Sequence, residues 1–198
     1  MSQNMEISSP KYEMNKEDLI ETILIIIYRI IDYNSSFEEK TPSIFDKNNY
    51  QQEIDSDKLS TSTSSNEENL NLKEENYTLH DYFYYWIKKL DFDENLLLLT
   101  MKNLDKLLAK DFILADENVK NILFTCMVIT QKNFEDENYN DKDYAKILEV
   151  STKDIINMQI EFLKYIDFSL YISDEEFNKY KRKMYKMWKK TLSFISFS

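Results

Sequence analysis

Apolar side chains recur every three or four residues over most of this chain, a spacing that places them on one side of an α-helix. Polar stretches that contain Ser, Thr or Asp as helix-start signals separate these patterns. No segment alternates apolar and polar residues far enough to indicate a β-strand, so we expect an all-α fold. The predicted helices cover residues 16–33, 78–90, 94–109, 116–134, 141–148, 153–167 and a final segment that begins at 173.

The most hydrophobic run, residues 19–31, lies in the first predicted helix. It is too short to span a bilayer and contains Glu21 and Arg29. Glu17 and Asp18 precede it, where a signal peptide would carry positive charge. We therefore expect this helix to pack its apolar stripe against the rest of the protein, and we expect no membrane partner.

The chain becomes polar between residues 34 and 76, where Ser, Asn, Thr, Glu and Lys predominate. Too few apolar residues occur there to offset the entropy of ordering, so we expect a disordered insertion. Residues 1–15 are expected to be a disordered N-terminus. Phosphorylation of the hydroxyl-rich tract 60–66 is an alternative role for the insertion, although such tracts also arise from biased codon usage.

The predicted helix that contains Lys132 is apolar on all sides between Val119 and Ile129, a pattern typical of a helix surrounded by other elements. Lys132 lies near its C-terminal end, where the helix carbonyls stabilise an ammonium group, but its side chain must leave a packed environment. A lysine that only extends its amine to water is the alternative. Cys126, the single cysteine, falls in this helix; we interpret it as a core residue in a reducing compartment.

The predicted helix 153–167 carries one polar residue on its apolar side. Ser151 and Asp154 form its start signal. At about 100° per residue, Gln159 falls near the centre of the apolar arc. A buried amide without partners costs roughly 1 to 3 kcal/mol, so we expect Gln159 to be hydrogen-bonded. Lys132 is a candidate neighbour if the two helices pack together.

Short blocks of sequence, in order and at matching spacing, resemble the P/U-type cyclins. They are TLHDY at 78–82, NLDKLL at 103–108, NVKNILFT at 118–125, Lys132, ED at 135–136, YN at 139–140, YAK at 144–146, EFL at 161–163 and FSL at 168–170. The resemblance covers about residues 77–180 and, more weakly, the helix at 16–33. It implies a single five-helix cyclin box at 77–172, with an additional N-terminal helix at 16–33 and a C-terminal basic amphipathic helix and tail at 173–198.

The resemblance also implies a kinase-binding interface. Lys132 matches the lysine that contacts the regulatory helix of the kinase in cyclins, and Gln159 matches the position that usually holds its partner glutamate. Neighbouring residues are expected from the loop 134–144 and from the first helix of the box. The expected interface residues are Lys132, Gln159, Phe134, Glu135, Asp136, Tyr139, Tyr144, Tyr82 and Trp86.

Several residues depart from the family pattern. Two glycines of that pattern are matched by Leu148 and Glu149, and an arginine by Asn121. The chain contains no glycine, so we attribute the glycine losses to the codon bias of an AT-rich eukaryotic genome. Glu is abundant, so codon bias does not explain Gln159, and the strength of kinase activation is in question. From the pattern alone, a glutamate at position 159 is expected to restore a charge pair and to raise activation, or at least not to lower it, if Lys132 is within reach.

Composition limits the chemistry that the chain supports. Its net charge of −11 argues against nucleic acid as the main partner, because phosphate neutralisation requires a basic surface. With His80 as the single histidine, one cysteine and no glycine, no catalytic pair, transition-metal ligand set or phosphate-binding loop is visible. Glu135, Asp136 and Glu137 could hold a hard cation but are more simply a solvated turn. We expect no enzyme activity, no cofactor and no small-molecule substrate.

Positive charge is concentrated on one face of the final helix. A nuclear import signal, a contact with an acidic surface and a solvated helix face all fit this pattern. We expect the protein in the cytoplasm, the nucleus or both. The residues of this face are Lys179, Lys181, Arg182, Lys183, Lys186, Lys189 and Lys190.

Two functions follow from these observations. In the first, the chain is the regulatory subunit of a cyclin-dependent kinase and contributes to cell-cycle or nutrient-linked control. It would hold the mobile helix of the kinase inward, so that the kinase glutamate pairs with the ATP-orienting lysine. In the second, the same box is an adaptor or scaffold that binds a partner without activating a kinase, and Gln159 is its signature.

Deletion of residues 51–68 is expected to change the free energy of unfolding by less than about 1 kcal/mol, because loop-closure entropy depends only logarithmically on loop length. Kinase binding should also stay unchanged. Chemical denaturation and a pull-down measure the two effects. Loss of binding would identify the tract as a recognition segment.

Overall fold

Helices are the only regular elements in the residues that the computed structural model describes, which are 14–36, 44–46 and 77–195. The all-α prediction is confirmed for these residues, and the predicted helix ends differ from the observed ones by a few residues. The helices are α1 (Lys16–Ser35), α2 (Leu79–Lys89), α3 (Glu94–Leu108), α4 (Val119–Phe134), α5 (Asp141–Leu148), α6 (Thr152–Tyr165) and α7 (Asp174–Ile195).

Helix α4 is the centre of the fold. It contacts α2, α3, α5 and α6, and every residue from Ile122 to Val128 is fully buried. Its apolar side chains therefore find partners in all directions, as the pattern predicts. Cys126 lies in this segment, and burial raises the pKa of its thiol well above the ordinary value. The thiol is neutral and acts as a core side chain.

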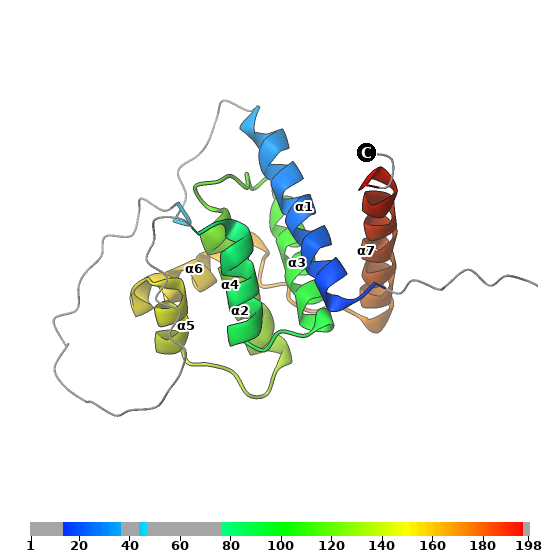
Figure 1. Cartoon of the computed structure of the whole chain (residues 1–198). Coiled ribbons are helices and arrows are strands. Elements are labelled where there is room, and N and C mark those ends of the chain that lie inside the picture. The colour runs from blue at the N-terminus through cyan, green and yellow to red at the C-terminus, as the bar shows by residue number, and fades with distance from the viewer. Residues whose placement is uncertain (1–13, 37–43, 47–76, 196–198) are drawn as a thin grey trace, which may run out of the picture.

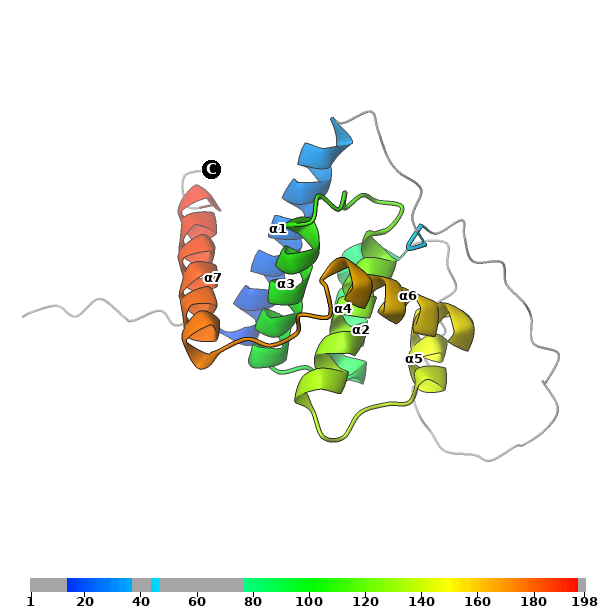
Figure 2. The same ribbon diagram turned by 180° about the vertical axis from the view of Figure 1, so that it is seen from behind.

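Two groups of helices lie on opposite sides of α4. Helices α1 and α7 pack beside each other and along α3 on one side, whereas α5 and α6 pack together on the other (Figures 1 and 2). The apolar stripe of α1 faces the core, with Ile20, Ile23 and Ile27 all buried. None of the described helices is long and apolar enough to cross a membrane.

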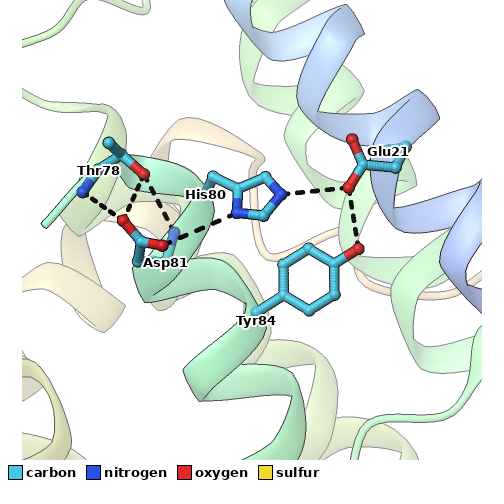
Figure 3. A network of polar contacts seen from close by, with 5 residues as sticks. All are labelled: Glu21, Thr78, His80, Asp81 and Tyr84. Carbon is cyan, nitrogen blue, oxygen red and sulfur yellow. Dashed lines mark hydrogen bonds and ion pairs between the residues drawn. The ribbon is translucent and has the colours of Figure 1, made fainter.

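A polar network fastens α1 to the start of α2 (Figure 3). Glu21 of α1 accepts a hydrogen bond from the hydroxyl of Tyr84 at 2.9 Å, and its Oε1 lies 3.2 Å from Nε2 of His80. Burial and the contact with Glu21 raise the pKa of Tyr84 to about 12, so this hydroxyl stays protonated. Thr78 and Asp81 form a capping box at the start of α2, beside His80. His80 thus serves at a helix start, and the network orients α1 on the box.

Part of the expected disordered insertion is ordered. Helix α1 continues to Ser35, and a short turn at 44–46 packs on the box. Phe45 is fully buried there, at 5.9 Å from the ring of Phe112, and its carbonyl accepts a hydrogen bond of 2.8 Å from Asn121. The expectation of disorder is wrong here because a single aromatic side chain buries enough apolar surface to hold a short turn. The rest of the insertion, tract 60–66 included, and residues 1–13 lie outside the described residues.

The two positions that match family glycines differ in backbone conformation. Leu148 is the last residue of α5 and is buried. Glu149 follows it as the C-cap, in the left-handed region at φ 63° and ψ 42°. A side chain at this position crowds the backbone, which glycine would avoid. Only the second glycine of the family pattern therefore meets a conformational need in this chain.

Glu149→Gly is expected to stabilise the protein by about 1 kcal/mol, because it removes the cost of a left-handed backbone at a residue with a side chain. Leu148→Gly is the matched control and should destabilise it by about 2 kcal/mol or more, because it removes a buried side chain. Equilibrium denaturation in urea measures both. A destabilised Glu149→Gly variant would mean that the glutamate side chain contributes more to the cap than its backbone costs.

Candidate functional site

Three polar side chains from three helices meet at one surface. Lys132 comes from the last turn of α4, Gln159 from the middle of α6 and Asp141 from the first turn of α5. Nζ of Lys132 donates to Oε1 of Gln159 at 2.9 Å and forms an ion pair with Asp141. Nε2 of Gln159 in turn donates to Oδ1 of Asp141 at 2.9 Å. The predicted pairing of Gln159 with Lys132 is confirmed, and each group in the cluster has a partner.

Asp141 is the member that sequence reasoning missed. Burial alone would raise the pKa of its carboxyl, but hydrogen bonds from Lys132 and Gln159, together with the charge of Lys132, lower it below its ordinary value. The carboxylate is therefore ionised beside the ammonium. The family pattern directs attention to position 159 for the negative charge, whereas in this chain the charge comes from α5. The signal in the sequence was Asp141 itself, an acidic residue directly after Asn140. Asn140 is the N-cap of α5.

Buried hydrogen bonds hold the end of α4 in place. The amide of Gln131, beside Lys132 in sequence, donates to the carbonyl of Leu90 at 2.8 Å and accepts from the hydroxyl of Tyr144 at 2.9 Å. Burial raises the pKa of Tyr144 to about 12, which keeps its hydroxyl a donor. Nζ of Lys132 lies 5.5 Å from the centre of the Tyr144 ring. Gln131 thus connects α2, α4 and α5 at the point where Lys132 leaves the core.

Apolar residues flank Gln159 on the outer side of α6. Ile156 and Ile160 are 40% and 43% exposed, and their helical spacing places them on the same side as Gln159. The arc around Gln159 was expected to be buried and is partly open to solvent, because α6 packs mainly against α4 and α5. The site therefore combines a fixed charge cluster with an uncovered apolar border.

The loop after α4 forms another border of the site. Phe134, the last residue of α4, is exposed, and so are Glu135, Asp136 and Tyr139 of the loop. The hydroxyl of Tyr139 donates to the carbonyl of Lys89 at 3.0 Å and ties the loop to the end of α2. Among the described residues no group of three or more His, Cys, Asp or Glu side chains is placed to hold a metal ion.

Three residues expected at the interface are instead in the core. Tyr82, Trp86 and Tyr144 are buried, and they line up with Phe124 of α4 in a series of ring contacts. The ring centroids lie 5.8 Å apart for Tyr82 and Trp86, 4.9 Å for Trp86 and Phe124, and 6.4 Å for Phe124 and Tyr144. The expectation of direct contact with a partner is wrong for them, because α2 and α5 turn their aromatic faces toward α4. These buried rings form the part of the core next to the site.

Comparison with known proteins gives one family. The model of the cyclin N-terminal domain matches residues 43–171, which is more than half of the chain. PHO85 cyclin-7 of Saccharomyces cerevisiae is 32% identical over 77 residues, which cover 39% of this chain and 27% of that protein. Cyclin-U1-1 of Arabidopsis thaliana is 36% identical over 63 residues, which cover 32% of this chain and 30% of that protein. These matches span less than a third of the relatives' own length.

The matched residues 43–171 include helices α2 to α6 and the Lys132 cluster. The chain belongs to the cyclin family, and its yeast and plant relatives identify it as a P/U-type cyclin.

Proposed function

We propose that this protein binds and activates a cyclin-dependent protein kinase through the surface around Lys132. We call it the kinase-binding surface. The observation that carries the proposal is the charge cluster of Lys132, Asp141 and Gln159 at the edge of an exposed apolar border. The surface comprises Lys132, Asp141, Gln159, Phe134, Glu135, Asp136, Tyr139, Ile156 and Ile160.

The geometry leaves one donor of Lys132 available for a partner. An ammonium group has three N–H donors, and two of them are used by Asp141 and Gln159. The side chain of Lys132 is 29% exposed, so the third donor can be reached from outside. A cation that is already fixed in position loses little entropy when it binds an acceptor. It can therefore anchor an acidic or carbonyl group on the helix of the kinase.

Asp141 favours activation over the adaptor alternative. That alternative depended on the loss of the negative charge at position 159. Asp141 supplies a carboxylate to the same ammonium from the neighbouring helix, so the charge pair is present in another form. A rigid surface of this kind would stabilise the inward position of the kinase helix, which is a population shift in the partner.

The relatives' names support the same class of partner. PHO85 cyclin-7 and PHO85 cyclin-6 are named for PHO85, and we extend a partner of the cyclin-dependent kinase class to this chain. Catalysis would belong to the kinase, and this subunit would have no turnover of its own. A role in cell-cycle or nutrient-linked control, in the cytoplasm or the nucleus, is part of the proposal. A pull-down followed by a phosphoryl-transfer assay on the recovered kinase tests it; an inactive bound kinase would select the adaptor.

Lys132→Glu is expected to abolish kinase binding, because it places a second negative charge beside Asp141 and an unpaired charge in a desolvated contact, at a cost of several kcal/mol. The fold should persist, since the side chain lies at a helix end near the surface. Lys183→Glu is the matched control: it also breaks an ion pair with an aspartate, Asp105, but on α7. Pull-down and circular dichroism measure the two effects. Unfolding of Lys132→Glu alone would make Lys132 a structural residue.

Gln159→Glu is now expected to lower kinase activation several-fold, the reverse of the expectation from the pattern alone. A glutamate would replace the amide donor that faces Asp141, and two carboxylates in contact repel each other. Asp141→Asn in the same chain should restore activity, because a charge pair and an amide are then present again in exchanged positions. Activation assays on the two single variants and the double variant measure the coupling. Additive losses in the double variant would show that the two positions do not act together.

A further inference from the structure

A groove lies between α1, α3 and α7, away from the kinase-binding surface. Its volume is about 660 Å³, within the range of ligand-binding pockets. Leu19 of α1 and Leu98 of α3 line it, and each is only 1% exposed, so the apolar part is recessed. The other lining residues are Met14, Glu94, Asn178, Lys181, Arg182, Tyr185 and Lys186.

Helix α7 contributes positive charge to one wall of this groove. Tyr180, Met184 and Trp188 recur every four residues and are buried against the rest of the fold. Arg182 and Lys186 are one turn apart and Lys181 precedes Arg182 directly; all three lie outside this buried row and line the groove. Three of the seven basic residues that the sequence singles out on α7 therefore line the groove.

The cations of the groove differ from Lys183 and Lys189 of α7 in having no ion-pair or ring partner among the described residues. Lys183 forms an ion pair with Asp105 at 3.3 Å, and Lys189 lies 4.8 Å from the centre of the Tyr185 ring. Lys181, Arg182 and Lys186 form no ion pair with any described residue and are exposed. Glu94 is the one acidic residue that lines the groove. In a chain with a net charge of −11, this concentration of free positive charge favours an acidic ligand.

We propose that this groove binds an acidic peptide segment of another protein, with a large apolar side chain inserted between carboxylates. The apolar side chain would contact Leu19 and Leu98, while the carboxylates would pair with Lys181, Arg182 and Lys186. The planar guanidinium of Arg182 can bind a carboxylate through two hydrogen bonds. Charge complementarity at the entrance and a recessed apolar floor thus favour the same kind of ligand.

Two other kinds of partner use only part of the groove. A polyanion would pair with the cations but leave the apolar floor without a contact. A membrane surface would meet the cations but could not reach side chains as recessed as Leu19 and Leu98. A peptide can extend one side chain inward while its neighbours stay at the entrance, so it fits both parts.

The groove and the kinase-binding surface are far apart. Helix α7 lies at one end of the molecule and α5 and α6 lie at the other, in both views of the chain (Figures 1 and 2). A peptide in the groove would therefore leave the kinase-binding surface open. The inference does not depend on the proposed function, and it can be tested on the isolated protein.

Selection from a displayed library of random peptides of about 12 residues provides the test. The full chain should enrich peptides that combine several Asp or Glu residues with one large apolar residue. Fluorescence anisotropy with a labelled consensus peptide should then give a dissociation constant that rises at least about tenfold in the Arg182→Glu, Lys186→Glu double variant. Replacement of the apolar residue of the peptide by alanine should weaken binding to a similar degree.

A charge-matched control separates the effect of charge at the groove from the effect of the net charge of the protein. Lys142→Glu with Lys153→Glu changes the net charge equally at the opposite end of the protein, and it should shift the dissociation constant by less than about twofold, because salt screens distant charges. Circular dichroism checks the fold of both variants. Peptides without acidic enrichment, equal losses in both variants, or full displacement by inorganic polyphosphate would overturn the proposal. So would binding to phosphatidylserine vesicles in the absence of peptide binding.

Discussion

Burial of α4 on all sides is the constraint on which the rest of this structure depends. A helix whose residues from Ile122 to Val128 have no exposure must be covered from several directions, and α2, α3, α5 and α6 provide the cover. Residues of α4 can reach the surface only at the two ends of this helix. Lys132 lies at one such end, so the position of the central helix determines where a fixed cation reaches the surface.

The charge at this surface comes from a different helix than the family pattern implies. An amide at position 159 both accepts from Lys132 and donates to Asp141, which a carboxylate cannot do. The ammonium and a carboxylate are thus both present, with the carboxylate on α5. In this chain the close packing of α5 against α6 therefore lets Asp141 provide the negative charge that residue 159 lacks.

The absence of glycine has a structural consequence elsewhere in the chain. Glu149 ends α5 in a left-handed conformation, and Asp91, Asp111, Asp167 and Phe168 also have positive φ values. Aspartate tolerates this region better than most residues, because its short side chain can bond to nearby backbone groups. The helix boundaries are therefore retained without glycine, and the strain is distributed over several helix ends and turns.

The sequence by itself determined the all-α fold and a helix α4 that other elements surround, because apolar periodicity is a local property of a helix. It singled out Lys132 and Gln159 as misplaced polar residues, but their pairing required α4 to pack against α6. It did not determine that Asp141 completes the cluster, that Tyr82, Trp86 and Tyr144 face inward, or that Phe45 anchors a turn in a polar stretch. These depend on which face of one helix meets which face of another. The groove beside α7 arises in the same way, since its apolar floor and its cations come from segments far apart in the chain. Periodicity gives the face of each helix, and only tertiary packing decides what that face contacts.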